Sequence, residues 1–527
     1  MGIKRVIFSF VSLMMASVII SAPAWSVAYQ GQLVLQSETP DDTLVGNFQA
    51  LGKFVQLRVY PATPSEVRIS VNSEVIFDGQ VQPAHNTVLM LSDSKAVRAG
   101  SNILKMHLVK GDVAVAVDYP VLREVSPEHA LTTAQKRTFR KVLQPYIGAD
   151  PEQHAFPGAA VLVARQGEIL FAEGQGMAQY QRLTEGRLEL LDSPRKVSVD
   201  TVFDLASVTK VVSTTAAIMH LVSENQLSLF DTLGELLPGF AETDKAAVTV
   251  QQLLTHRSGL WEWQPTWLHR RYSSASVFAY LAALDRRYAI GEKRAYSDIG
   301  FMLLGQVVTR VTGESIDEYV KKHIHQPLGM MSTTYKPPVS WRQHIAATSQ
   351  GNRYEQNMVA TSSPYPILST PAFTDTFAGY RDYTLLGEVN DGNAWYALDG
   401  VAGHAGLFSN VVDLARFCQM MLNEGGYGNA MIATPETVAT FLSTPYDTNQ
   451  AHGFWRYESG DGRVSFGHAG FTGTQIMFRP DDQLIVILLT NRQHNGLPES
   501  GRYPSLNAAW NSILTVVDTL NDTKEAP

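Results

Sequence analysis

The sequence predicts two domains: an α+β domain at residues 123–527 and, before it, a small β-sandwich-like domain at residues 29–122. In the first region, hydrophobic and polar residues alternate over many short runs. In the second, hydrophobic strands lie near both ends and helical patterns fill the middle. Strands far apart in the sequence must then assemble into one sheet, which is typical of an α+β fold.

Four runs in the N-terminal region have a period of two, and turn residues such as Asp78-Gly79 and Gly111-Asp112 separate them. Short alternating strands at such spacing indicate a β-sandwich. The region contains no cluster of catalytic residue types, so we expect a binding or spacer module. The runs are residues 55–59, 67–71, 104–108 and 113–117.

The second region begins with Ser126-Pro127, a cap residue and a proline typical of a helix start, which predicts a helix to about Leu143. A hairpin of buried strands follows at residues 160–171, with its turn at Gln166-Gly167. Residues 351–398 lack clear periodicity and predict a long active-site loop. The remaining predicted elements are strands at 475–478 and 484–489 and a helix at 506–520.

The N-terminus has the pattern of a secretory signal. Lys4 and Arg5 precede an apolar stretch at residues 6–20, and small residues follow, so cleavage is expected after Ala24 or Ala28. Residues 1–28 therefore predict export to the periplasm. The alternative is an uncleaved anchor that associates the protein with the inner membrane, although the stretch is short for a span of about 20 residues.

The composition is that of a globular protein, with 45% hydrophobic and 17% charged residues. The net charge is -8 and no basic stripe is present, which argues against nucleic-acid binding. The one cysteine, Cys418, cannot form an internal disulfide and is expected to be buried. No His, Cys, Asp or Glu residues show metal-ligand spacing, so we expect no metal and no cofactor. The oligomeric state is left open.

Ser207 and Lys210 lie three residues apart, directly before a long apolar-periodic segment. At a helix start this spacing puts the hydroxyl and the amine on one face, within hydrogen-bond reach. An amine so placed can activate a serine without a histidine. The spacing recurs at Ser92/Lys95, in a polar turn, and at Ser193/Lys196, before a proline, but neither of these serines opens a helix.

Two further motifs lie downstream. Tyr296-Ser297-Asp298 precedes a helical run, and its phenol can shuttle a proton. Residues 467–473 form a glycine-rich stretch around His468 ahead of the strand 475–478, which we expect at the sheet edge. Glycines there allow a substrate backbone to approach closely and leave an amide free to face an oxyanion.

In this order the three motifs resemble the serine β-lactamase and penicillin-binding protein superfamily. The resemblance is to its class C-like branch, closest to the penicillin-binding protein 4B group of D-alanyl-D-alanine carboxypeptidases. It covers about residues 125–520 and implies an antiparallel sheet flanked by helices, with a helical subdomain. Four further segments also resemble sequences of this superfamily: residues 252–260, 326–330, 403–409 and 488–492.

The resemblance implies that Ser207 is the acylated nucleophile and that Lys210 accepts its proton or activates it electrostatically. Tyr296 would relay a proton to the leaving group and later help to activate water. His468 stands where class C β-lactamases have lysine, and it would hydrogen-bond Tyr296 or, when protonated, receive a substrate carboxylate. The backbone amides of Ser207 and Phe471, with Gly470 beside them, would form the oxyanion hole.

Asp298 departs from the superfamily, which usually has asparagine there. A carboxylate near Lys210 would favour the ammonium form and repel a substrate carboxylate, which argues against strong β-lactam binding. The other interpretation is that Asp298 caps the helix that follows.

Other histidines have structural interpretations. His404 lies between Gly403 and Gly406, where a loop histidine that stabilises the turn is favoured over a substrate contact. His256 is expected to be buried and hydrogen-bonded. His323 and His325 would point to different faces of a helix.

The leading hypothesis is an exported serine hydrolase that forms an acyl-enzyme. Its predicted activity is that of a D-alanyl-D-alanine carboxypeptidase or D-amino-acid peptidase on cell-wall peptides. The alternatives are an esterase or a β-lactamase of the same fold, because all these substrates share a tetrahedral intermediate. A β-lactamase is disfavoured by Asp298 and the additional domain. A third hypothesis is a non-catalytic binding protein.

Overall fold

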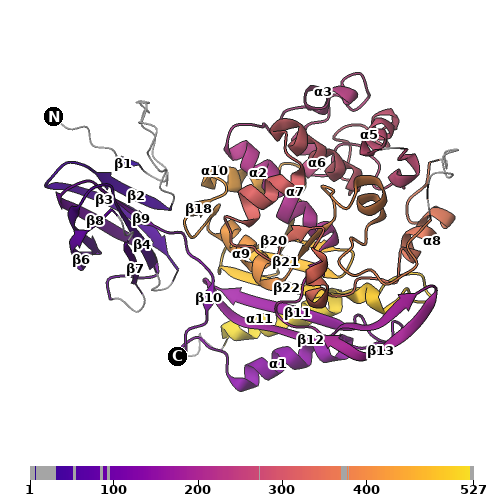
Figure 1. The fold of residues 1–527 in the computed structure, drawn as a ribbon, viewed down its shortest axis with the longest axis horizontal. Helices are drawn as coiled ribbons and strands as arrows, with labels where there is room; N and C mark the ends of the chain where they lie inside the picture. Colours follow the sequence, from indigo (N-terminus) through magenta and orange to yellow (C-terminus); the bar gives the residue numbers. More distant parts are fainter. Residues whose placement is uncertain are drawn as a thin grey trace. The chain divides into compact units, whose positions relative to one another are not determined.

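The computed structural model describes residues 6–7, 31–51, 55–83, 87–91, 95–271, 273–368, 377 and 379–522. Apart from Val6–Ile7, the predicted signal segment lies outside the described residues, as does Ser92. The chain divides into two compact units (Figure 1). The first consists of Met1–Leu122 and Gln419–Ile432, and the second of Arg123–Cys418 and Ala433–Pro527.

The first unit contains two antiparallel sheets, in the orders β1-β2-β9-β4-β7 and β3-β8-β5-β6. Along β3 (Asp42–Ala50), where no run was predicted, every second residue is buried. Leu57 and Val115 of one sheet share a core with Val67 and Leu104 of the other, which confirms the predicted β-sandwich-like domain. The other strands are β1 (Val6–Ile7), β2 (Leu33–Ser37), β4 (Val55–Pro61), β5 (Ser65–Val71), β6 (Glu74–Val81), β7 (Thr87–Leu91), β8 (Gly100–Lys110), β9 (Val113–Val117) and the hairpin β17 (Gly426–Tyr427) and β18 (Ala430–Met431).

The second unit is built on a sheet with the order β10-β12-β11-β22-β21-β20-β19, with β13 paired to β12. Its central strands β11 (Gly158–Arg165) and β22 (Leu484–Thr490) are almost completely buried, because helices cover both faces (Figure 1). These two strands confirm the predicted pairing of distant segments. The remaining strands are β10 (Arg123–Glu124), β12 (Glu168–Thr184), β13 (Arg187–Lys196), β19 (Trp455–Glu458), β20 (Val464–Gly470) and β21 (Thr474–Arg479).

One face of this sheet packs on α1 (Thr133–Leu143) and α11 (Asn507–Asp522). Val161 and Val486 point to this side and contact a core that includes Phe139 and Ile513.

The helical subdomain covers the other face of the sheet (Figure 1). It contains a small sheet of β14 (Phe203–Asp204), β16 (Leu407–Ser409) and β15 (Thr334–Tyr335). Its α-helices are α2 (Ala216–Ser223), α3 (Leu233–Leu236), α4 (Val250–Leu254), α5 (Ser274–Ala283), α6 (Asp298–Thr312), α7 (Ile316–Val320), α8 (Arg353–Thr361), α9 (Val411–Leu422) and α10 (Pro435–Leu442). The unit's 3₁₀ and π segments are η1 (Gln144–Tyr146), η2 (Ala206–Val208), η3 (Lys210–Thr215), η4 (Pro238–Phe240), η5 (Thr266–His269), η6 (Lys321–His325), η7 (Val339–His344), η9 (Asn393–Ala397) and η10 (Arg492–Asn495).

Two local predictions were wrong. The first helix begins at Thr133 with Thr132 as its cap, not at Ser126, because Thr132 and Gln135 form a complete capping box, whereas Ser126 starts a turn. Residues 187–196 form the exposed strand β13, where no element was predicted. The segment 351–398 is not all loop, since it contains α8 and η9.

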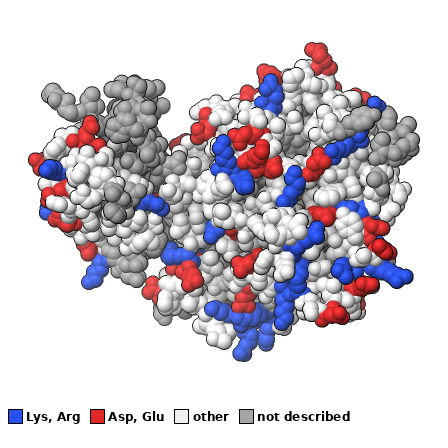
Figure 2. All heavy atoms as spheres, in the orientation of Figure 1, with Lys and Arg blue, Asp and Glu red and all other residues white. Residues whose placement is uncertain are grey.

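Positive and negative side chains are interspersed over most of the face seen in Figure 2, and Lys and Arg side chains gather at its lower edge. Cys418 is buried in α9, as predicted. In the part of the chain that the structure describes, no helix has the length and hydrophobicity needed to cross a membrane.

Candidate active site

Ser207 lies in η2, which continues into η3 and α2. The preceding residue, Ala206, has φ 44°, a left-handed conformation that is unfavourable for a residue with a Cβ atom. The buried Asp204 holds it by accepting a hydrogen bond from the Ala206 N–H at 2.9 Å. This sharp turn presents the Ser207 hydroxyl at the edge of a cleft.

Lys210 is completely buried beside Ser207. Its Nζ atom donates to Ser207 Oγ at 3.0 Å and to the His404 carbonyl oxygen at 3.1 Å. It also forms an ion pair with Asp298, with 2.6 Å between Nζ and Oδ1. Burial alone would lower the pKa of Lys210, but Asp298 and Tyr296 outweigh it and raise the pKa. Lys210 is therefore an ammonium group at rest.

The Tyr296 hydroxyl faces both the Lys210 amine and the Ser207 hydroxyl. Burial raises the pKa of Tyr296, and the charge of Asp298 adds to this against the opposing effect of Lys210, so the phenol keeps its proton. The His256 ring lies against Tyr296 with 4.5 Å between centroids, and His256 Nδ1 accepts from the Ser297 N–H at 3.1 Å. This agrees with the predicted buried, hydrogen-bonded His256.

Asp298 does not cap α6. The cap is Ser297, whose Oγ accepts a hydrogen bond from the Gly300 N–H at 3.0 Å. Because Asp298 is the first helical residue, its side chain is free to turn toward Lys210. The interpretation as a lysine partner is the one that the geometry supports.

His468 lies within strand β20 rather than in a loop ahead of an edge strand, and β19 forms the edge outside it. Its Nδ1–H donates to the Ala469 carbonyl oxygen at 2.8 Å, and its ring stacks on Trp455. Its centroid is 6.0 Å from that of Tyr296, but the buried Nε2 atom has no hydrogen-bond partner among the described residues. Burial and the Lys210 charge lower the pKa of His468 to about 3. This environment opposes a protonated His468 that receives a substrate carboxylate.

The end of β20 is tied to the segment before the nucleophile. Thr472 Oγ1 donates to the Asp204 carbonyl oxygen at 2.6 Å, and Thr474 Oγ1 to that of Leu205 at 2.8 Å. Gly470 is so close that a Cβ atom there would lie 2.3 Å from the Leu205 oxygen. These contacts bring the Phe471 turn alongside Ser207, where the two backbone amides are predicted to face an oxyanion.

Arg492, which sequence reasoning left without a role, supports this turn. Its Nε donates to the Phe471 carbonyl oxygen at 3.0 Å and its Nη1 to that of Pro504 at 2.9 Å. Its guanidinium also lies over the rings of Phe471 and Tyr503. In the sequence, Arg492 stands out only because it belongs to the segment 488–492, which resembles the superfamily. That resemblance gives no information about its contacts.

A pair of carboxyl groups, those of the buried Glu355 and the half-buried Asp391, was also missed. Asp391 accepts from His404 Nε2 at 2.9 Å, and although burial opposes it, His404 lowers the pKa of Asp391. Glu355 accepts from the Gly392 N–H at 2.6 Å, and burial together with the Asp391 charge raises the pKa of Glu355 to about 8. Glu355 is thus largely protonated at pH 7 while Asp391 is charged. His404 therefore contacts Asp391 through its ring and Lys210 through its carbonyl oxygen, whereas the sequence predicted only that it stabilises the glycine turn.

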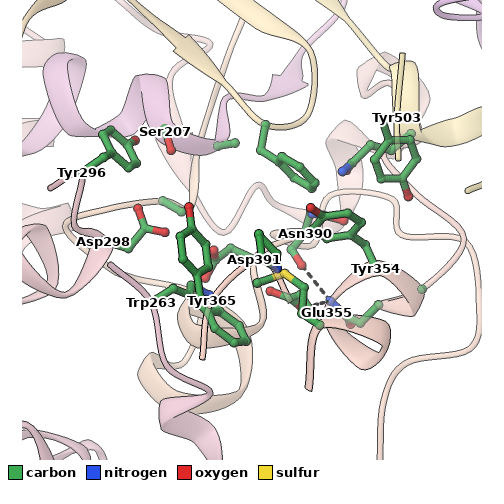
Figure 3. A pocket seen from close by; sticks show the side chains of 18 residues that line it. Ser207, Trp263, Tyr296, Asp298, Tyr354, Glu355, Tyr365, Asn390, Asp391 and Tyr503 are labelled. Carbon is green, nitrogen blue, oxygen red and sulfur yellow. Dashed lines mark hydrogen bonds between the residues drawn. The ribbon is translucent and has the colours of Figure 1, made fainter. Parts of the chain in front are cut away.

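The cleft has a volume of about 180 Å³ (Figure 3). The described residues of its lining include three carboxyl groups, those of Asp298, Glu355 and Asp391, and no Lys, Arg or His is among them. Elsewhere, His325 is buried and approaches the Val212 carbonyl oxygen, while His323 stacks on Tyr319. Among the described residues no three His, Cys, Asp or Glu side chains are grouped to hold a metal ion. The full lining is Ala206, Ser207, Trp263, Tyr296, Asp298, Gly351, Asn352, Tyr354, Glu355, Met358, Pro364, Tyr365, Asn390, Asp391, Ala405, Phe471, Gln493 and Tyr503.

A family model described as Beta-lactamase matches residues 139–509, which is more than half of the chain. The chain belongs to the beta-lactamase family. Members of this family are generally serine hydrolases, and the match confirms the resemblance predicted from the motifs.

Among relatives of this beta-lactamase-family chain, an "N-acetylmuramyl-L-alanine amidase" of Bacillus subtilis (strain 168) is 31% identical over 69% of the chain and 85% of its own length. A protein of Escherichia coli (strain K12) named "Putative D-alanyl-D-alanine carboxypeptidase" is 29% identical over 74% of the chain and 90% of its own length. A solved class C beta-lactamase has a TM-score of 0.55 at 17% identity and covers 74% of this chain and 97% of its own. This structural likeness confirms the predicted fold.

Proposed function

We propose that this chain is an exported serine hydrolase that cleaves an amide bond of cell-wall peptides through an acyl-enzyme. The observation that carries the proposal is Ser207 Oγ 3.0 Å from Lys210 Nζ, with the Tyr296 hydroxyl facing both, at the edge of an open cleft. Export rests on the signal pattern of residues 1–28.

The protonation states support a relay through Tyr296. Because Lys210 is charged and Tyr296 is neutral, neither is a free base at rest. As Ser207 Oγ attacks the carbonyl carbon, Tyr296 accepts the serine proton and gives its own to the leaving nitrogen, so the phenol stays neutral. The C–N bond breaks, an ester to Ser207 forms and an amine leaves. Lys210 stabilises the charge that develops on the attacking oxygen.

The oxyanion lies between the amides of Ser207 and Phe471, and a single such donor is worth about 2.7–4 kcal/mol of transition-state stabilisation. Deacylation runs through the same groups in reverse. A water molecule takes the place of the amine and gives a proton to Tyr296, and Ser207 recovers its proton as the ester breaks.

The charge of the cleft favours one substrate class. A terminal D-alanyl-D-alanine and a β-lactam both bring a carboxylate close to the reacting bond. Here that carboxylate would meet Asp298 and Asp391, while the described part of the lining offers no Lys, Arg or His to receive it and Lys210 is buried and paired. An amide between N-acetylmuramic acid and L-alanine has no free carboxylate at that place, so we favour this amidase activity. Carboxypeptidase activity is the second candidate, supported by the name of the Escherichia coli relative.

The test is hydrolysis by the full chain of two substrates, N-acetylmuramyl-L-alanyl-D-isoglutamine and an acyl-D-alanyl-D-alanine peptide. We expect the first to have the higher kcat/KM, with activity abolished in Ser207→Ala and an acyl adduct on Ser207 detected by intact mass. A higher kcat/KM for the D-alanyl peptide would instead support carboxypeptidase activity. Unchanged hydrolysis in Ser207→Ala would refute the acyl-enzyme.

A further inference from the structure

Asp204 is a buried carboxylate between two segments that line the cleft. It belongs to β14 and is 3% exposed. Its Oδ1 atom accepts a hydrogen bond from the Ala206 N–H at 2.9 Å, and its Oδ2 atom accepts one from the Asn390 N–H at 2.6 Å. Asp204 itself is not one of the described residues of the cleft lining, so it affects a substrate only through the residues that it holds.

The two donors belong to separate parts of the active site. Ala206 directly precedes the nucleophile Ser207, and Asn390 directly precedes the charged Asp391. All four residues line the cleft, and Figure 3 shows Ser207, Asn390 and Asp391 around it. Asn390 is 186 residues away from Asp204 in the sequence. One carboxylate therefore determines where the nucleophile lies relative to the segment at Asn390.

The turn at Ala206 depends on this carboxylate. Its φ of 44° is unfavourable for a residue with a Cβ atom, so without an acceptor for its N–H the backbone relaxes and moves the Ser207 hydroxyl. Burial raises the pKa of Asp204 to about 6, although the two N–H groups oppose this. At pH 7 the carboxylate form predominates, and a charged acceptor holds N–H groups more strongly than a neutral one.

We propose that Asp204 is a positioning residue for acylation, because its carboxylate fixes the turn that carries Ser207 against the segment that carries Asn390. Acylation requires the Ser207 hydroxyl to stay aligned with Lys210 and with the carbonyl carbon of the substrate. A small displacement of the reacting groups is enough to slow such a step. The inference rests on the acyl-enzyme of the proposed function but not on the identity of its amide substrate.

The ester p-nitrophenyl acetate tests the inference without a cell-wall substrate. Ser207 Oγ attacks its acetyl carbon, the ester bond breaks and p-nitrophenolate leaves, while the serine proton passes through Tyr296 to solvent. Pre-steady-state release of p-nitrophenolate separates the acylation rate constant from the dissociation constant of the ester, and Ser207→Ala gives the background.

In Asp204→Asn the side chain keeps only one of its two acceptor oxygens. Either the Ala206 N–H or the Asn390 N–H then loses its partner, whichever way the amide turns. We expect the acylation rate constant to fall about tenfold or more, while the dissociation constant of the ester changes by less than about twofold.

Asp413→Asn is the matched control. Asp413 is also 3% exposed and also accepts a backbone hydrogen bond, from the Ser332 N–H at 2.7 Å. Neither Asp413 nor Ser332 is among the described residues that line the cleft. We expect both aspartate variants to have a lower thermal midpoint, but only Asp204→Asn to lose acylation rate.

A double-mutant cycle shows whether the turn at Ala206 transmits the effect. Glycine adopts a positive φ without steric cost, so the turn in Ala206→Gly depends less on the hydrogen bond. Asp204→Ala removes both acceptors, and it should slow acylation about tenfold or more in the wild-type background but less than about threefold in the Ala206→Gly background. Should Asp204→Ala fail to fold, the comparison of Asp204→Asn with Asp413→Asn decides alone.

The positioning role is overturned if Asp204→Asn acylates within about twofold of the wild-type rate, or if Asp413→Asn loses as much rate. An equal fall in both backgrounds of the cycle also overturns it. The proposed amidase function fails separately, if the wild-type chain hydrolyses no cell-wall amide while Asp204→Asn still slows acylation by the ester. Absence of any Ser207-dependent release in the wild type would overturn both.

Discussion

Lys210 and Asp298 form an ion pair in which Nζ lies 2.6 Å from Oδ1. The superfamily usually has asparagine in place of Asp298. The carboxylate keeps the buried amine charged, and it stands where a substrate carboxylate would approach. One residue thus influences both the route of the serine proton and the charge of the substrate that the cleft accepts.

Asp298→Asn should therefore increase acylation by β-lactams. The pKa of Lys210 should fall, because burial is then opposed by less negative charge, and repulsion of the β-lactam carboxylate should weaken. We expect at least about a tenfold higher rate of labelling by fluorescent penicillin, since two like charges about 6 Å apart repel by about 3 kcal/mol at an effective dielectric constant of 20. Asp192→Asn, on exposed β13, is the control, and equal labelling of the two variants would contradict the role given to Asp298.

Gly470→Ala should damage the site. Its Cβ atom would lie 2.3 Å from the Leu205 oxygen and 2.2 Å from Thr474 Oγ1, so the Phe471 turn must move away from Ser207. We expect a loss of about 1–3 kcal/mol in stability from overpacking and a large fall in kcat. Gly460→Ala is the matched control because nothing lies within 4 Å of its Cβ position. A Gly470→Ala enzyme with wild-type kcat would argue against an oxyanion hole at Phe471.

Arg492→Leu should lower kcat more than it changes KM. The guanidinium holds the Phe471 carbonyl, and hydrogen bonds from charged groups are worth about 1.5–3 kcal/mol. Because the neighbouring amide acts on the oxyanion, the loss should appear mainly in the transition state, at about tenfold or more in kcat. Arg140→Leu, at an exposed ion pair with Glu173, serves for comparison. An effect confined to KM would mean that Arg492 only shapes the binding surface.

The stability of the second unit should fall as pH rises toward 8. Glu355 binds its proton more tightly in the folded chain, because burial and Asp391 raise its pKa to about 8 from an ordinary value of 4.5. The stabilisation is complete below pH 4.5 and is lost as pH rises through the folded-state value. Glu355→Gln should flatten this part of the curve, measured as thermal midpoints from pH 5 to 8. Identical slopes in wild type and variant would contradict a protonated Glu355.

The fold and the order of the three motifs were predictable because each depends on local sequence. The alternation of β5, the uninterrupted apolar run of β22 and the Ser207/Lys210 spacing are each properties of one short stretch of chain. Strand β13 was missed although Leu188 and Leu190 alternate with polar residues; both leucines are exposed, so this alternation marks no buried face.

The role of Asp298 could not be predicted from the local sequence. A carboxyl residue at the start of a helix is compatible with a cap and with an ion pair, and only the position of Lys210 separates the two. His468 is similar, since its charge depends on burial beneath Trp455 and on the nearby Lys210.

The sequence by itself determined the fold class, the nucleophile candidate and the superfamily resemblance, because periodicity and short motif spacings are local properties of the chain. Tertiary structure alone decided the protonation states and the cleft lining. Glu355 and Asp391 follow no common spacing, and their chemistry arises only where burial removes water and brings distant charges together.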